Sequence, residues 1–175
     1  MTDTTLMVED QAPVHEILKG ASMETVYNLF KFLHIVGAIV WIGGVITAAI
    51  IAARAAREKN QIVLAAVARQ NRFHGTAVIG PSVGLTLIAG IVMIAVSGLG
   101  VPLWVIWGFA AMIISMALGA TLIRRAGDQV SELAASAQSN DARLSALQQQ
   151  LLTLNIINVL LLLSAVWAMV FKPAL

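Results

Sequence analysis

The first long apolar stretch of the chain reads VYNLFKFLHIVGAIVWIGGVITAAIIAA and covers residues 26–53. A helix that crosses a hydrocarbon core of about 30 Å needs roughly 20 residues, so this stretch is long enough to span a membrane. A membrane-spanning strand would be shorter and would alternate between apolar and polar residues, which this stretch does not do. Because lipid offers the backbone no hydrogen bonds, a helix is the expected state.

Three further runs have the same apolar character, residues 75–96, 101–123 and 151–171. Together the four runs predict an all-α, polytopic membrane protein built as a four-transmembrane-helix bundle. We expect this membrane domain to cover residues 23–175 and the lipid bilayer to be its main partner. Residues 1–22 are polar and acidic, and we expect them to form a tail.

The composition narrows the function classes. Of the 175 residues 59% are hydrophobic and 11% are charged, whereas a soluble domain carries about 25% charged residues. The formal net charge is only +2, so nucleic acid is not an expected partner. There is no cysteine, which excludes disulfides, thiolate metal sites and thiol catalysis. All nine acidic residues lie outside the four apolar runs, which disfavours proton-coupled transport through a buried carboxylate.

The basic residues predict the orientation. Eight of the 11 lie in the first and third connections: Arg54, Arg57, Lys59, Arg69, Arg72, Arg124, Arg125 and Arg143. Basic connections stay in the cytoplasm, so we expect both termini on the outer side of a bacterial inner membrane. The Ala-rich residues 54–72 should be helical, either extending the first helix or lying on the membrane surface.

One face of the first predicted helix carries candidate site residues. Its members follow one another at intervals of four, three, four, three and four: Phe30, His34, Gly37, Trp41, Gly44 and Ala48. This spacing places them on one side of a helix. The face combines a histidine and a large aromatic ring with positions that lack bulk. We therefore predict a cofactor-binding face formed by His34, Gly37, Trp41 and Gly44.

Two interpretations of this face stay open. Small residues allow another helix backbone to approach closely, and a flat ligand could use the same room. Packing is the better interpretation for the glycines. His34 is different, because an ionisable group about 12 Å inside a bilayer is costly unless it has a partner or a function. His34 is thus either a ligand for haem iron or copper, or a hydrogen-bonding residue between helices.

Methionines extend the metal hypothesis. Met93 and Met169 should lie in the outer half of the bundle, as His34 does, and a histidine with thioethers suits Cu(I). Haem can also take a His–Met pair, but Met is a common filler of apolar interiors. His74 should lie near the opposite interface, about 20 Å from His34 along the membrane normal, so one haem is not expected to join the two.

Other polar positions in the spans have ordinary packing roles. Gly80 and Gly84 flank Pro81 in a small-residue pattern, which indicates close helix contact and permits a kink. Asn155 and Asn158 need partners in the inner half of the bundle and are expected to hydrogen-bond between helices. The sequence contains no hydrolytic triad or phosphate loop, and it leaves catalytic residues unassigned and enzymatic activity open.

The segment from Phe32 to Gly44 resembles the first helix of CopD-like membrane proteins. The chain is most similar to an uncharacterised bacterial family of four-helix integral membrane proteins within the CopD-like and HemJ-like group. Members of that family have a similar Lys-Phe-Leu-His segment, and they end on a motif like Met169-Val-Phe-Lys-Pro173. The region of Pro81 with Gly90 downstream is also similar. The resemblance covers roughly residues 27–173.

The resemblance implies possible functions. The group includes copper-resistance proteins and a protoporphyrinogen oxidase that binds haem b, and His34 matches the histidine of its first-helix motif. That oxidase also has a basic residue after the glycine pair and a lysine in a later span, and both are missing here. Three hypotheses follow: a protein that binds haem b or acts in redox chemistry, a copper-handling protein with His34, Met93 and Met169, or a structural subunit that packs into a homo-oligomer or larger complex.

Overall fold

The structure is a computed structural model that describes residues 14–58, 60–98, 100–135 and 141–172. Nearly all of these residues are helical, and the described part of the chain contains no strand. The elements in chain order are α1 (Val14–Arg57), α2 (Gln61–His74), η1 (Gly75–Ile79), α3 (Gly80–Ser97), α4 (Leu103–Leu118), η2 (Gly119–Ile123), α5 (Arg124–Ala135) and α6 (Asp141–Phe171). The all-α prediction is confirmed.

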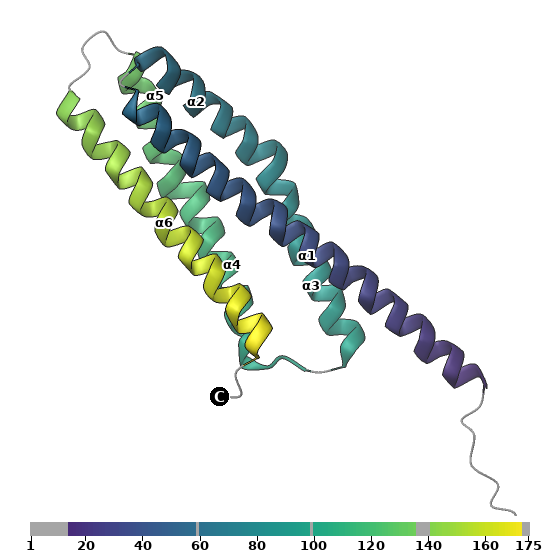
Figure 1. The fold of residues 1–175 in the computed structure, drawn as a ribbon. Coiled ribbons are helices and arrows are strands. Elements are labelled where there is room, and N and C mark those ends of the chain that lie inside the picture. The colour runs from purple at the N-terminus through teal and green to yellow at the C-terminus, as the bar shows by residue number, and fades with distance from the viewer. Residues whose placement is uncertain (1–13, 59, 99, 136–140, 173–175) are drawn as a thin grey trace, which may run out of the picture.

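The elements form four long rods that lie side by side in antiparallel order (Figure 1). The first rod is α1, the second runs through α2, η1 and α3, the third runs through α4, η2 and α5, and the fourth is α6. α1 begins at Val14, inside the stretch where a tail was expected, and projects beyond the other rods at one end (Figure 1). Ser139 and Asn140 are residue types that commonly cap helices, and they lie outside the described residues.

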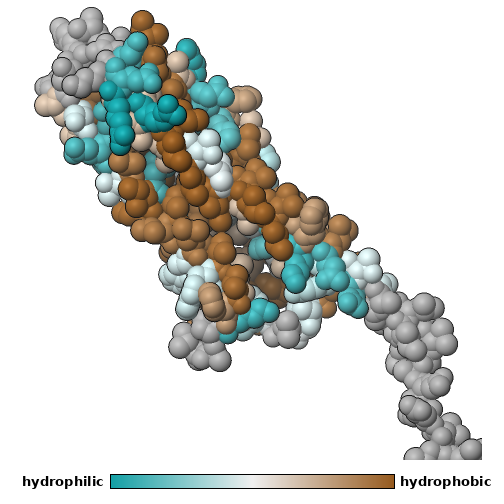
Figure 2. Space-filling view, in the orientation of Figure 1, coloured by the Kyte–Doolittle hydropathy of each residue, from teal (hydrophilic) through white to brown (hydrophobic). Residues whose placement is uncertain are grey.

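All four rods are long and apolar enough to cross a membrane, over residues 22–57, 62–97, 103–134 and 142–171. Large apolar side chains point outward, such as Ile113 at 65% exposure and Val170 at 67%. Figure 2 shows them as a brown band around the middle of the molecule, with hydrophilic residues gathered toward both ends. A surface of this kind is stable in lipid rather than water, so the chain is an integral membrane protein with four spanning helices.

The two ends of the bundle differ in composition. One end, here called the basic end, contains the turn between α1 and α2, the last residues of α5 and the first of α6, with the arginines at positions 54, 57, 69, 72, 124, 125 and 143. The other end, here called the tryptophan end, contains Trp104, Trp107 and Trp167 together with the α3–α4 connection. The described chain starts and finishes at the tryptophan end (Figure 1).

Each half of the bundle has its own core. The membrane core joins all four rods through Trp41, Val45, Val83, Met112 and Leu162. The second core lies at the basic end and consists of Ala55, Leu64, Val130, Ala134 and Leu144. Trp41 and Ala55 are 14 residues apart on one helix, or roughly 21 Å, so the second core extends the bundle beyond the first rather than thickening it.

The second core decides how the basic segment folds. The first and second rods turn at Asn60, whose side-chain Oδ1 accepts hydrogen bonds from the backbone N–H groups of Ile62 and Val63. Both helices continue past the membrane core into this part, here called the basic head, where α2 packs on α5 and α1. Arg72 and Asp128 form an ion pair across α2 and α5. Residues 54–58 and 60–72 thus stand upright as part of a four-helix head and do not lie flat on a surface.

Two π-helical turns separate the membrane part from the basic head. In η1 the N–H of Gly80 bonds the carbonyl of Gly75, five residues earlier. Pro81 follows directly, and a proline ring clashes with the carbonyl four residues before it, which is that of Ala77. The wider π turn relieves this clash, so the predicted break at Pro81 takes the form of a bulge. In η2 the N–H of Arg124 bonds the carbonyl of Gly119 in the same way.

The tightest helix contact lies between α1 and α3. Gly37 is buried, and a Cβ at this position would lie 2.5 Å from Thr86 Oγ1 and 3.1 Å from both Ser82 O and Thr86 N. Two of these three atoms are backbone, so they cannot rotate away. The α1–α3 contact therefore depends on the missing side chain of Gly37.

A pair of alanine substitutions tests this contact. Gly37→Ala should lower the melting temperature in detergent by several degrees, because overpacking against backbone costs about 1–3 kcal/mol. Gly43→Ala is the matched control, since nothing lies within 4 Å of a Cβ there. It should leave the melting temperature unchanged or raise it slightly, because alanine favours helix over glycine. Equal melting temperatures for the two variants would contradict the described packing.

Candidate functional site

His34 lies in the contact between α1 and α3, and one of its ring nitrogens is fixed. Nδ1 is 2.8 Å from the backbone carbonyl oxygen of Thr86. A carbonyl oxygen can only accept, so Nδ1 carries the hydrogen and donates it. The residue is half-buried in the part of the bundle between the membrane core and the tryptophan end.

Gly90 leaves room for the imidazole beside this hydrogen bond. It follows Thr86 by four residues, so it stands directly beyond the carbonyl that accepts from His34. A Cβ on Gly90 would lie 3.4 Å from both Nδ1 and Cε1 of the imidazole, which is van der Waals contact. Larger branched side chains would therefore compete with the ring for this space. The Thr86 hydroxyl does not take part, because it donates to Ser82 O at 2.8 Å.

The fixed Nδ1–H determines the chemistry of the other ring nitrogen. In the neutral imidazole Nε2 then holds a lone pair, and within the described part of the chain no hydrogen bond to Nε2 is found. Nε2 of His34 is also accessible at the protein surface, whereas Nε2 of His74 is buried. An Nδ1–H that donates to a backbone carbonyl commonly orients metal-binding histidines, because it fixes both the tautomer and the ring direction. His34 can therefore act as a ligand through Nε2.

The other predicted members of the His34 face contact protein atoms. Gly37 faces Thr86, Trp41 is 5% exposed within the membrane core, and a Cβ on Gly44 would lie 3.2 Å from His74 Nε2 and from Ile79 Cγ1. Contact of these three residues with a cofactor stays a prediction. The packing directs any ligand of His34 to the sides of the imidazole that α3 does not cover.

His74 reaches the same helix as His34, but at a different depth. Its Nε2 is buried against Gly44 and has no hydrogen-bond partner. Gly44 and His34 are ten residues apart on α1, or about 15 Å. The nearby Asn71 donates its Nδ2–H to Ala48 O at 3.4 Å. The two imidazoles are thus too far apart to share one metal ion, as the sequence indicated.

Residue counting relates the methionines to His34. Trp41, Val83 and Leu162 contact one another in the membrane core. Seven residues from each of them toward the tryptophan end, the helices reach His34, Gly90 and Met169 in turn. The contact between His34 and Gly90 supports the conclusion that these three residues lie at the same depth. Met169 is thus level with His34, but its Cε methyl lies 2.5 Å from where a Cβ of Gly108 would be. Met93 is one turn beyond Gly90. Contact of either thioether with His34 stays a prediction.

The asparagines form part of the packing on the basic side of the core. The Ser115 hydroxyl donates to Asn158 Oδ1 at 2.6 Å, and both residues are buried. Asn155 donates to Leu151 O on its own helix at 2.8 Å. Asn158 therefore bonds between helices as expected, whereas Asn155 does so within α6. Among the described residues no three His, Asp or Glu side chains converge on a metal position.

Thr86 fixes His34 through its backbone and was not among the predicted site residues. A backbone acceptor leaves no trace in side-chain identity, so only the neighbouring Gly90 could have indicated it. The spacing between Thr86 and Gly90 does indicate an accessible carbonyl. Gly90 and Thr86 are four residues apart, and a gap in side chains directly beyond a carbonyl lets a ring from another helix reach it.

Four spanning helices with an oriented histidine in one helix contact define a polytopic α-helical membrane protein with a candidate ligand site. Within that class the chain belongs to the DUF2269 family of predicted integral membrane proteins, whose model matches residues 28–173. The match covers α1 from Asn28 onward and the other three rods, and it includes His34 and Thr86. No curated protein and no solved structure matches the chain.

Replacement of His74 tests whether its buried nitrogen has a role. A buried polar atom without a partner is costly, so His74→Leu should keep the melting temperature or raise it by a few degrees. The measurement is thermal unfolding in detergent. A clear drop in melting temperature would mean that Nε2 binds a water or an ion that stabilises the α1–α2 contact.

Proposed function

We propose that the protein binds a metal-centred cofactor through Nε2 of His34, with haem b as the first candidate. The observation that carries this proposal is the hydrogen bond from Nδ1 to Thr86 O, which leaves the lone pair of Nε2 for a ligand. A single oriented histidine is sufficient to hold haem iron on one side. The likeness of residues 32–44 to the first helix of CopD-like and HemJ-like proteins supports the same choice.

Copper is the second candidate, and the geometry favours it less. Cu(I) would need His34 together with the thioethers of Met93 and Met169. The terminal methyl of Met169 packs against Gly108, and copper would need three side chains to converge whereas haem would need only His34. When bound, haem would supply redox or ligand-binding chemistry, and the chain's own part is to orient the imidazole and exclude water.

Substitution of the histidine tests the proposal. His34→Ala should lose the Soret absorbance of the purified protein, because alanine offers no nitrogen to the iron. His74→Ala is the matched control and should retain it, since that ring lies about 15 Å away along α1. Both variants should insert and migrate as the parent does in size-exclusion chromatography. The same pair with copper content as the readout tests the second candidate.

Two outcomes would contradict the proposal. Full Soret absorbance in His34→Ala would remove the histidine as a ligand. A parent protein that carries neither haem nor copper after gentle extraction, and takes up neither on reconstitution, would leave His34 as a hydrogen-bonding residue between α1 and α3. The structural-subunit hypothesis, with a homo-oligomer or larger complex as partner, would then rank first.

We also infer that the basic end faces the cytoplasm of a bacterial inner membrane, since arginine-rich connections remain on that side. The basic head would then lie inside the cell, and the end with Lys31 and Lys172 outside. A cysteine at Ala56 should resist a membrane-impermeant thiol reagent in intact cells, while one at Val101, in the exposed α3–α4 connection, should react. The opposite labelling pattern would reverse the orientation.

A further inference from the structure

Lys31 is a cation one turn from His34, nearer the tryptophan end. The two residues are three apart on α1, so their Cβ atoms are about 5–6 Å from each other. Tyr27, which lines a pocket at the tryptophan end with Val96 and Ser97, lies a further four residues out, or about 6 Å. Lys31 is therefore close to the tryptophan end, at a depth from which a lysine can extend its ammonium to the interface.

Lys31 points toward the bundle rather than away from it. It shares one side of α1 with Ala38 and Val45, because residues seven apart lie on the same face. Val45 packs in the membrane core against the other rods. Lys31 is nevertheless exposed, because the rods diverge toward the tryptophan end. No Cα atom of α3 lies within 8 Å of one in α4 or α6.

Among the described residues no carboxylate pairs with Lys31. The ion pair recorded there is that of Arg72 with Asp128, at the other end of the molecule. The nearest described carboxylate on α1 toward the tryptophan end is Glu24, seven residues or about 10 Å away. Within the described chain the Lys31 ammonium is therefore available to an anionic group of a ligand or of lipid.

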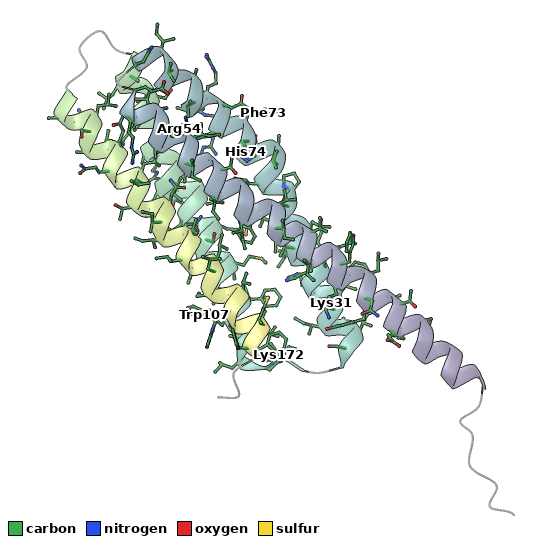
Figure 3. All side chains as sticks on the ribbon, in the orientation of Figure 1. Lys31, Arg54, Phe73, His74, Trp107 and Lys172 are labelled. Atoms are coloured by element: carbon green, nitrogen blue, oxygen red, sulfur yellow. The ribbon has the colours of Figure 1, made fainter. Side chains whose placement is uncertain are left out.

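Lys172 is a second lysine at the tryptophan end, and its ammonium can be compared with that of Lys31. It lies at the end of α6 and, ten residues from Leu162, is level with Lys31, which is ten residues from Trp41 (Figure 3). Its ammonium already has a partner, since Nζ is 5.5 Å from the centre of the Trp104 ring. Its backbone N–H is bonded to Ala168 O at 2.9 Å. The two lysines thus have the same charge at the same depth, but only Lys31 lacks a partner in the described chain.

We propose that Lys31 binds a carboxylate of the ligand that His34 holds, so that the ligand is an amphiphile with an apolar body and an anionic edge toward the tryptophan end. This inference rests on the proposed function. The lysine side chain leans toward the start of α1 and thus toward the interface, which is where the acid groups of an embedded ligand would project. Haem b, a flat apolar macrocycle with two carboxylate arms, belongs to this class.

The test uses full-length protein in phosphatidylcholine nanodiscs. Iron protoporphyrin IX and its dimethyl ester, which lacks the two negative charges, are each titrated and followed by Soret absorbance. His34→Ala sets the baseline for nonspecific uptake. Lys31→Met should weaken binding of the diacid about tenfold and leave binding of the diester unchanged, because only the diacid makes the charged hydrogen bond. Lys31→Arg should restore diacid binding, and the matched control Lys172→Met should change it by less than about twofold.

The outcomes distinguish failure of the Lys31 role from failure of cofactor binding by His34. A parent that shows no Soret band above the His34→Ala baseline with either compound overturns the proposed function, and the role of Lys31 with it. Specific Soret bands that Lys31→Met leaves unchanged, or weakens equally for diacid and diester, overturn the role of Lys31 alone. Lipid is the other source of an anion. If phosphatidylglycerol stabilises the unliganded parent but not Lys31→Met, while diacid binding is unchanged, the partner of Lys31 is a lipid phosphate.

Discussion

The close approach of α1 and α3 at Gly37 is the contact on which the rest of this structure depends. Without a side chain at Gly37, the Thr86 hydroxyl and the Ser82 carbonyl can lie against the α1 backbone. In lipid there is no hydrophobic force between helices, so such van der Waals contact is a main source of stability. The same approach brings the Thr86 carbonyl within reach of His34, one turn away. Packing and the candidate site therefore have a common origin.

This arrangement also explains why the candidate ligand has only one free nitrogen. An imidazole inside a membrane must satisfy its N–H with a hydrogen bond. Here Nδ1–H of His34 donates to the backbone carbonyl of Thr86, so no other side chain is needed. A side-chain acceptor could rotate, whereas a helix carbonyl is fixed in direction. The orientation of His34 is therefore as rigid as the helix contact itself. His74 shows the alternative, an imidazole nitrogen enclosed against Gly44 with no acceptor.

The sequence predicted the four spans because long apolar runs have a single solution in lipid. It also indicated that Gly37 and Gly44 would pack, since they recur at helical spacing. The expected close contact at Gly80 and Gly84 was wrong, because a Cβ on Gly84 would have nothing within 4 Å and one on Gly80 would meet only Gly75 O of the same rod. It could not predict the basic head. The apolar residues of that part, such as Leu64, Val130 and Leu144, are scattered among charges and become a core only when four helices meet. The Thr86 acceptor was hidden for another reason, because every residue has a carbonyl and only the register between two helices selects one.

The π turns η1 and η2 allow one rod to contact different helices in the membrane part and in the basic head. A π turn holds one more residue than an α turn of the same height, so it rotates the helix face beyond it by about 100°. In the second rod α3 contacts α1, while α2 contacts α5 as well. In the third rod α4 contacts α6, while α5 contacts both α2 and α6. Each π turn thus changes which side of the rod faces the bundle. The membrane part and the basic head can therefore each bury their own apolar residues, although they share continuous helices.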